Sequence, residues 1–194
     1  MSALNNPVPA ATAEKEMLLA LLRESREKFL NSFAGLSDEQ SRSKSEGSWS
    51  VLDTVEHLTV AEKTMVRLIT TGRRPKSPGT PNREDLFLHA LTDRSRKLQS
   101  PEGARPTGRF ASLAEAAAQF NAARQKALEF VCSTNEDLRA TEVTHPHPAA
   151  GTVSTCEMLI VMAKHAERHA LQIEEIKATL GMATQSYKAD HGRR

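Results

Sequence analysis

The sequence has 194 residues, of which 39% are hydrophobic and only 4% are aromatic, and its formal net charge is +2. A chain of this length fits one domain and buries a hydrophobic core without disulfides, and a core poor in aromatic residues suits helix-on-helix packing better than a β-sandwich. Acidic and basic residues are interspersed, so we expect neither nucleic acid nor a membrane as a partner.

Two long helices are predicted in the first part of the chain. The first covers about Ala13–Phe33, where apolar residues recur with helical spacing, and Gly35 follows it. The second begins after Ser50, which has the spacing of a capping box to Asp53, and closes at about residue 72. A polar, Ser-rich stretch separates the two.

Two more long helices are predicted in the second half of the chain. The third starts after Ser112, which has capping-box spacing to Glu115, and continues to about residue 132. The fourth starts after Ser154, with Glu157 in the same relation, and runs to about Leu180. Each of these helices therefore carries its own start signal.

A connection of about 40 residues, rich in Pro, Gly and Arg, joins the second helix to the third, and it contains one short predicted helix near residues 84–91. The predicted fold is therefore all-α, a four-helix bundle with a long crossover between helices 2 and 3. No internal repeat or low-complexity linker divides the chain, so we expect one domain over residues 1–194, with residues 1–11 and 184–194 flexible.

Two histidines, His165 and His169, share the apolar side of the fourth helix, one turn apart. That side follows steps of three or four residues through Met158, Met162, His165, His169, Ile173, Ile176 and Leu180. Buried neighbouring imidazoles cost desolvation unless both find partners, and a divalent metal ion satisfies both at once. For this pair alone, the better interpretation is that each ring binds a backbone carbonyl or a carboxylate.

A third ligand would change that balance, and His57 on the second helix is the candidate. It lies on a face that a bundle can bring against the fourth helix. Three imidazoles leave coordination positions open for water or substrate, as in catalytic rather than structural metal sites. His145 and His147 are rival ligands, although their Pro-flanked loop predicts exposed turn residues. His89 and His191 are predicted to be surface histidines.

The HAERH stretch is not the signature of the zinc proteases, because Ala166 stands where their general base is a Glu. Glu167 lies about 200° round the helix from His165 and points away from the site. Glu62 is a candidate carboxylate that orients a water, with an ion pair to Lys or Arg as the alternative. Asp53 is either a partner of the His57 ring or only a helix cap.

No nucleophile elbow, P-loop or dinucleotide-binding motif occurs in the sequence. Cys132 and Cys156 form no CxxC motif, and a disulfide between them is not expected. The first residues lack the pattern of a signal peptide, so we expect a cytoplasmic protein. The sequence patterns leave the metal interpretation as the main functional hypothesis.

Three stretches together resemble the DinB-like superfamily, in particular its branch of metal-dependent hydrolases: WSVLDTVEHL (49–58), HPHPAAGTVSTCEMLIVMAKH (145–165) and HAERHALQIEEI (165–176). The family pattern of a Trp, a His two turns later, and a His-x₃-His followed by Gln-Ile corresponds here to Trp49, His57, His165, His169, Gln172 and Ile173. The resemblance implies a four-helix bundle with a crossover, a divalent metal ion, commonly nickel or zinc, held by His57, His165 and His169, and a homodimer.

Three functions follow as hypotheses. The first is a metal-dependent, hydrolase-like enzyme acting through a bound water on a small molecule that the sequence does not identify. The second is a thiol S-transferase, since members of the resembling family use low-molecular-weight thiols; cations of the crossover would then bind the acidic groups of the thiol. Those cations are Arg73, Arg74, Lys76 and Arg83. The third is a metal-binding, stress-associated protein without catalysis.

Overall fold

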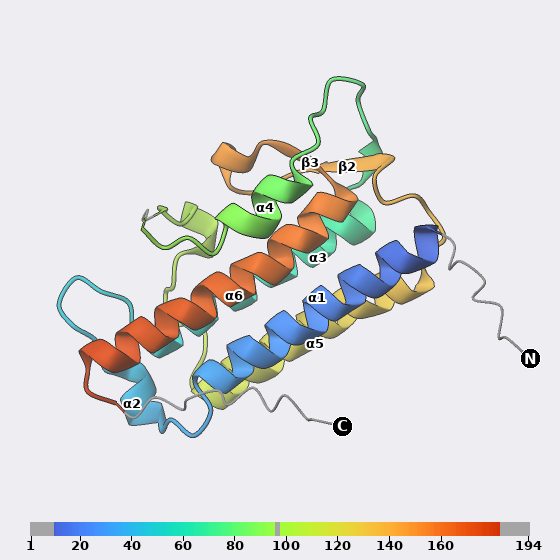
Figure 1. The fold of residues 1–194 in the computed structure, drawn as a ribbon. Coiled ribbons are helices and arrows are strands. Elements are labelled where there is room, and N and C mark those ends of the chain that lie inside the picture. The colour runs from blue at the N-terminus through green and yellow to red at the C-terminus, as the bar shows by residue number, and fades with distance from the viewer. Residues whose placement is uncertain (1–9, 96–97, 183–194) are drawn as a thin grey trace, which may run out of the picture.

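The computed structural model describes residues 10–95 and 98–182, and four long helices make up most of this part of the chain (Figure 1). They are α1 (Ala10–Ser32), α3 (Val51–Thr71), α5 (Leu113–Ser133) and α6 (Thr155–Thr179). The predicted four-helix bundle is confirmed. Helix α1 already includes residues 10 and 11, which we expected to be flexible, and the predicted flexible stretch 184–194 lies outside the described residues.

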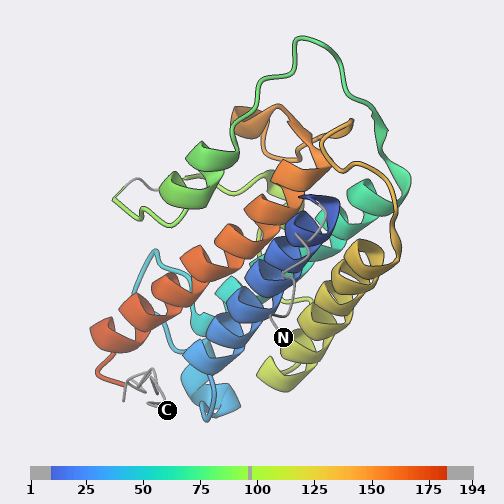
Figure 2. The ribbon, with the colours of Figure 1, turned by 45° about the vertical axis from the view of Figure 1, so that its right-hand side comes forward.

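The four helices form a ring in which α6 packs against α1 and α3, while α5 packs against the other sides of α1 and α3. Helices α3 and α5 run in the same direction, and α1 and α6 run in the opposite one (Figures 1 and 2). Two helices that run in the same direction need a connection as long as the bundle, which explains the crossover between α3 and α5. Helix α6 packs antiparallel against α3, so side chains of the two helices face each other.

Short elements fill the connections. They are α2 (Asp38–Arg42), α4 (Glu84–Ala90) and the 3-10 turns η1 (Glu102–Ala104) and η2 (Pro148–Ala150). Helix α4 is the short helix predicted in the crossover, and it packs against α6. No helix of the described chain is long and apolar enough to cross a membrane.

A small antiparallel sheet, which the all-α prediction did not include, closes one end of the bundle. Its strands are β1 (Arg74–Pro75), β2 (Thr141–Thr144) and β3 (Thr152–Ser154), in the order β1-β2-β3. Glu142 lies opposite Arg74 on one side and Ser154 on the other. Strand β3 leads directly into α6, so the sheet fixes the loop before that helix.

Local capping signals account for the starts of α3, α5 and α6. Ser50 with Asp53, and Ser154 with Glu157, both form complete capping boxes, as predicted. Ser112 also caps its helix, but Glu115 reaches the backbone N–H of Ala111 (2.8 Å) and not that of the cap residue. The predicted box at α5 is therefore only half formed.

A buried polar layer crosses the bundle between two apolar clusters, one at each end. The side chain of Arg124, on α5, is fully buried and donates to both carboxylate oxygens of Glu62 on α3, at 2.5 and 3.1 Å. It also donates to the Leu22 carbonyl and the Ser25 hydroxyl of α1 (2.9 and 2.7 Å), and to the Met162 carbonyl of α6 (3.1 Å). One guanidinium group thus bonds to all three other helices.

Candidate metal centre

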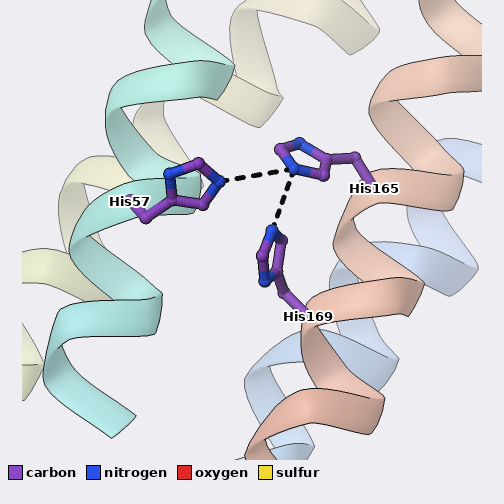
Figure 3. A group of neighbouring side chains, drawn as sticks. All are labelled: His57, His165 and His169. Atoms are coloured by element: carbon purple, nitrogen blue, oxygen red, sulfur yellow. Dashed lines mark hydrogen bonds between the residues drawn. The ribbon is translucent and has the colours of Figure 1, made fainter. Parts of the chain in front are cut away.

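Three histidine rings converge between α3 and α6 (Figure 3). Helix α3 contributes His57, and α6 contributes His165 and His169 from consecutive turns. The Nε2 atom of His165 lies 3.4 Å from that of His57 and 2.9 Å from that of His169. One ligand nitrogen from each ring falls within 4.8 Å of the other two. The antiparallel packing of α3 on α6 therefore brings together the three histidines singled out in the sequence.

Hydrogen bonds at the opposite ring nitrogens explain why the Nε2 atoms are available. Nδ1 of His57 lies 2.8 Å from the carbonyl oxygen of Ala104, and Nδ1 of His169 lies 2.9 Å from Oε1 of Gln172. These oxygens only accept, so each Nδ1 carries the proton and each Nε2 presents a lone pair. Such partners fix the ring orientation of metal-binding histidines.

The spacing of these nitrogens fits a tetrahedral metal ion. A Zn–N distance of about 2.0–2.1 Å places two ligand nitrogens about 3.3–3.4 Å apart, and the His57 and His165 nitrogens are 3.4 Å apart. The His165–His169 separation of 2.9 Å is shorter, so these rings would spread by a few tenths of an ångström. Imidazole nitrogens of this kind suit several divalent transition metals, among them zinc, copper, iron and nickel.

Burial keeps the three imidazoles neutral. It lowers the pKa of His57, and burial together with the neighbouring rings holds the pKa of His165 and of His169 well below the usual 6.5. A metal ion binds the neutral ring, so these shifts leave the ligands ready at neutral pH. The ring of Trp49 packs on His57 with centroids 5.0 Å apart and covers this side of the centre.

A cavity of about 1350 Å³ borders the three histidines. Its walls come from the loop before α3, α3 itself, helix α4, residues 98–106 of the crossover, the loop at residues 145–150, and α6. Met65, Phe87 and Val161 make part of its surface apolar, whereas Arg94 and Arg168 line it with cations. Arg94 is paired with Glu175, and Arg168 donates to carbonyl oxygens, one of them that of Leu91.

The loop histidines His145 and His147 belong to this cavity and not to the metal group. We predicted exposed turn residues, but both are half-buried. Nδ1 of His145 accepts the backbone N–H of His147 (2.9 Å), and Nε2 of His147 lies 3.2 Å from the Gln99 carbonyl. The two histidines are half-buried because the crossover folds over their loop, and this long-range contact is not encoded in the local sequence. His89 is exposed, as predicted, and His191 lies outside the described residues.

The two carboxylates singled out in the sequence, Glu62 and Asp53, have structural roles in the helix bundle. Both oxygens of Glu62 bind Arg124, which is the ion pair we considered as the alternative, and Glu62 does not line the cavity. We therefore do not retain it as a water-orienting group. Asp53 accepts from the backbone N–H of Ser50 and from Lys44, both at 2.9 Å, so it caps α3. The partner of the His57 ring is the Ala104 carbonyl, which no side-chain pattern reveals.

The fold agrees with the comparison to known proteins. The family model of the DinB superfamily matches residues 21–173, and the chain belongs to this superfamily. A similar solved structure is that of YfiT from Bacillus subtilis, described as a probable metal-dependent hydrolase with an unusual four-helix bundle topology. It is 15% identical, with a TM-score of 0.57 over 94% of this chain and 95% of that one. No curated protein matches the sequence.

Proposed function

We propose that this protein is a metal-dependent enzyme of the hydrolase type, which holds one divalent ion, nickel or zinc, on His57, His165 and His169. The observation that carries the proposal is the convergence of three neutral imidazole nitrogens at the edge of a large cavity. The description of YfiT as a probable metal-dependent hydrolase supports the same reaction class.

A divalent ion held by three histidines would keep open positions, and it would supply there the Lewis acidity that activates a water and polarises a carbonyl or phosphoryl oxygen. The side chains of this protein supply the rest. Ala104 and Gln172 orient the ligand rings, and the apolar part of the cavity wall offers a surface for apolar groups of a substrate. His145 offers a hydrogen-bond donor to a substrate in the cavity. Its Nδ1 accepts the His147 N–H, so the neutral ring carries its proton on Nε2.

Metal removal and restoration test this proposal. The protein, purified without a histidine tag, is stripped with a chelator and assayed against chromogenic carboxylic and phosphate esters before and after addition of Zn²⁺ or Ni²⁺. We expect hydrolysis to return with one equivalent of metal, His169→Ala to stay inactive, and the exposed-surface control His89→Ala to behave as wild type. Hydrolysis that is indifferent to metal or to His169→Ala would refute the proposal.

A thiol S-transferase is the second candidate, and the size of the cavity favours it. Ligand sites commonly measure about 300–1,000 Å³, so a cavity of about 1350 Å³ has room for a thiol and a second substrate. Three of the four cations expected to bind the thiol are otherwise engaged, however. Arg73 and Arg74 pair with Glu136 and Glu142, and Arg83 donates to backbone carbonyls.

The two candidates differ in their response to thiols. Glutathione or cysteine, added to the metal-loaded protein, raises the melting temperature in a concentration-dependent way if the cavity binds a thiol. S-methylated analogues are the control, since their sulfur cannot ionise to a thiolate ligand. An unchanged melting temperature favours the hydrolase. Metal binding without either activity would favour the third hypothesis, a stress-associated metal-binding protein. A homodimer in the cytoplasm stays a prediction, which sedimentation and fractionation test.

A further inference from the structure

We propose that Glu56, the residue before His57 on α3, is a positioning residue of the metal centre. It acts by holding residues 99–109 of the crossover, here called the strap, against the His57 ring. This inference rests on the proposed function, because it assumes that His57 is a metal ligand. Glu56 itself is not among the residues that line the cavity or form the histidine group.

Both carboxylate oxygens of Glu56 accept hydrogen bonds from one end of the strap. Its side chain is almost completely buried, and Oε1 accepts the backbone N–H of Thr107 (2.6 Å) and a guanidinium N–H of Arg109 (2.8 Å). Oε2 accepts the backbone N–H groups of Gly108 and Arg109, both at 3.0 Å. Gly108 has φ +78°, a conformation that glycine adopts readily and that lets three successive N–H groups converge on one carboxylate.

The other part of the strap forms hydrogen bonds with His57 and His147. The Ala104 carbonyl lies 2.8 Å from Nδ1 of His57, and the Ser100 hydroxyl lies 3.1 Å from the same nitrogen. The Gln99 carbonyl lies 3.2 Å from Nε2 of His147. Within the described chain, these are the hydrogen bonds that tie strap residues 99–106 to other elements. The strap therefore has two anchors on α3, and they are adjacent residues.

Because Glu56 and His57 are adjacent, the contact of Glu56 with the strap affects the contact of the strap with the His57 ring. A buried carboxylate that accepts four hydrogen bonds is costly to release, because the charge would be left without partners. Held in this way, the strap presents the Ala104 carbonyl to Nδ1 of His57, which fixes the tautomer with the lone pair on Nε2. A looser strap would let the ring rotate or take the other tautomer, and metal affinity would fall although no ligand has changed.

Glu56→Gln tests the inference, since the amide keeps the shape of the side chain but loses the charge and turns one acceptor into a donor facing N–H groups. Its affinity for Zn²⁺ is measured by competition with a chelator, and the visible spectrum of bound Co²⁺ reports the ligand geometry. We expect the Zn²⁺ affinity to fall about tenfold, as when other hydrogen-bond partners of ligands are removed, and the Co²⁺ bands to change.

Glu142→Gln is the matched control. Glu142 is as buried as Glu56 and also accepts a backbone N–H, from Ser77 (3.1 Å), together with a guanidinium N–H of Arg74 (3.0 Å). It touches neither the strap nor the three histidines, so its substitution should lower the melting temperature and leave the Zn²⁺ affinity and the Co²⁺ spectrum unchanged. If Glu56→Gln does not fold, Arg109→Gln removes only the guanidinium contacts, to Glu56 and to the Arg105 carbonyl within the strap, and a smaller loss in the same direction is expected.

The outcomes separate the two proposals. If His57→Ala loses Zn²⁺ while Glu56→Gln, or Arg109→Gln in its place, binds Zn²⁺ and Co²⁺ as wild type does, the positioning role is overturned and the metal site stands. If Glu142→Gln weakens Zn²⁺ binding as much as Glu56→Gln, the effect is general destabilisation and the inference is overturned. If wild type binds no Zn²⁺, the proposed function itself fails.

Discussion

At the scale of single residues, the ring nitrogen that carries the proton decides what each histidine does. His57 and His169 each donate from Nδ1 to an oxygen, a contact similar in kind to the carbonyl or carboxylate bond that we considered for the His165 and His169 pair as the alternative to metal binding. The two interpretations are compatible, because these contacts use Nδ1 and leave Nε2 for an ion. The sequence could not show this, since it places a ring on a helix face without fixing its tautomer.

Gln172→Leu tests the contribution of this second hydrogen bond. The substitution removes the acceptor of the His169 Nδ1–H, so we expect the affinity for Zn²⁺ to fall by about tenfold. Competition titration with a chelator measures the change. Gln119→Leu is the control, because among the described residues the exposed Gln119 side chain bonds only to Lys63 at the surface, and the variant should bind Zn²⁺ as wild type does. Equal affinities for both variants would contradict the tautomer argument.

At the scale of elements, the polar layer of Glu62 and Arg124 links the four long helices through hydrogen bonds. Sequence analysis noticed Glu62 among apolar neighbours, but its partner lies on another helix 62 positions away. An acid on an apolar helix face signals a buried partner without identifying it. The position of the layer between two apolar clusters shows that it is structural.

Replacing one member of this ion pair should be severe. Arg124→Met leaves the Glu62 carboxylate buried without its cation, and we expect a loss of about 3–5 kcal/mol in the free energy of unfolding, measured in urea. The double variant Glu62→Leu with Arg124→Met should lose less, because no charge is left unpaired. Lys28→Met, at an exposed pair with Glu167, should cost under about 1 kcal/mol. A mild effect of Arg124→Met would refute the role of the layer.

Elements that rest on local signals could be predicted, and those that rest on long-range pairing could not. Ser50 and Ser154 start helices through contacts three residues away, which a sequence pattern encodes. Strand β1 has two residues, too few for any periodicity, and pairs with a segment 68 positions away. The strap meets His57 through the backbone carbonyl of Ala104, so side-chain patterns gave no sign of it.

The sheet end of the molecule should respond to acid through Glu142. Hydrogen bonds, the largest from Thr80, lower the pKa of this carboxyl from 4.5 to about 2. A lowered carboxyl pKa stabilises the fold fully above pH 4.5, and this contribution is lost as the pH falls from 4.5 towards 2. Thermal melts of wild type and Glu142→Gln should differ above pH 5 and converge near pH 2. A constant difference across this range would contradict the assignment.

At the scale of the whole molecule, the antiparallel pairing of α3 with α6 creates the histidine centre, and the crossover builds the cavity beside it. Membership of the DinB superfamily and the likeness to the four-helix bundle of YfiT agree with the bundle seen here. The crossover contributes α4 and the strap, and thereby two of the cavity walls. Because a shared fold does not transmit a substrate, we expect specificity to reside in these walls.

The central claim is that three histidines hold one divalent ion, and metal stoichiometry tests it most directly. Untagged protein is loaded with Zn²⁺ or Ni²⁺, dialysed, and analysed for metal content, together with His57→Ala, His165→Ala and His169→Ala. We predict one ion per chain in the wild type and in His89→Ala, and less than a tenth as much in each of the three variants. Wild-type protein without stoichiometric metal, or variants that keep it, would contradict the account.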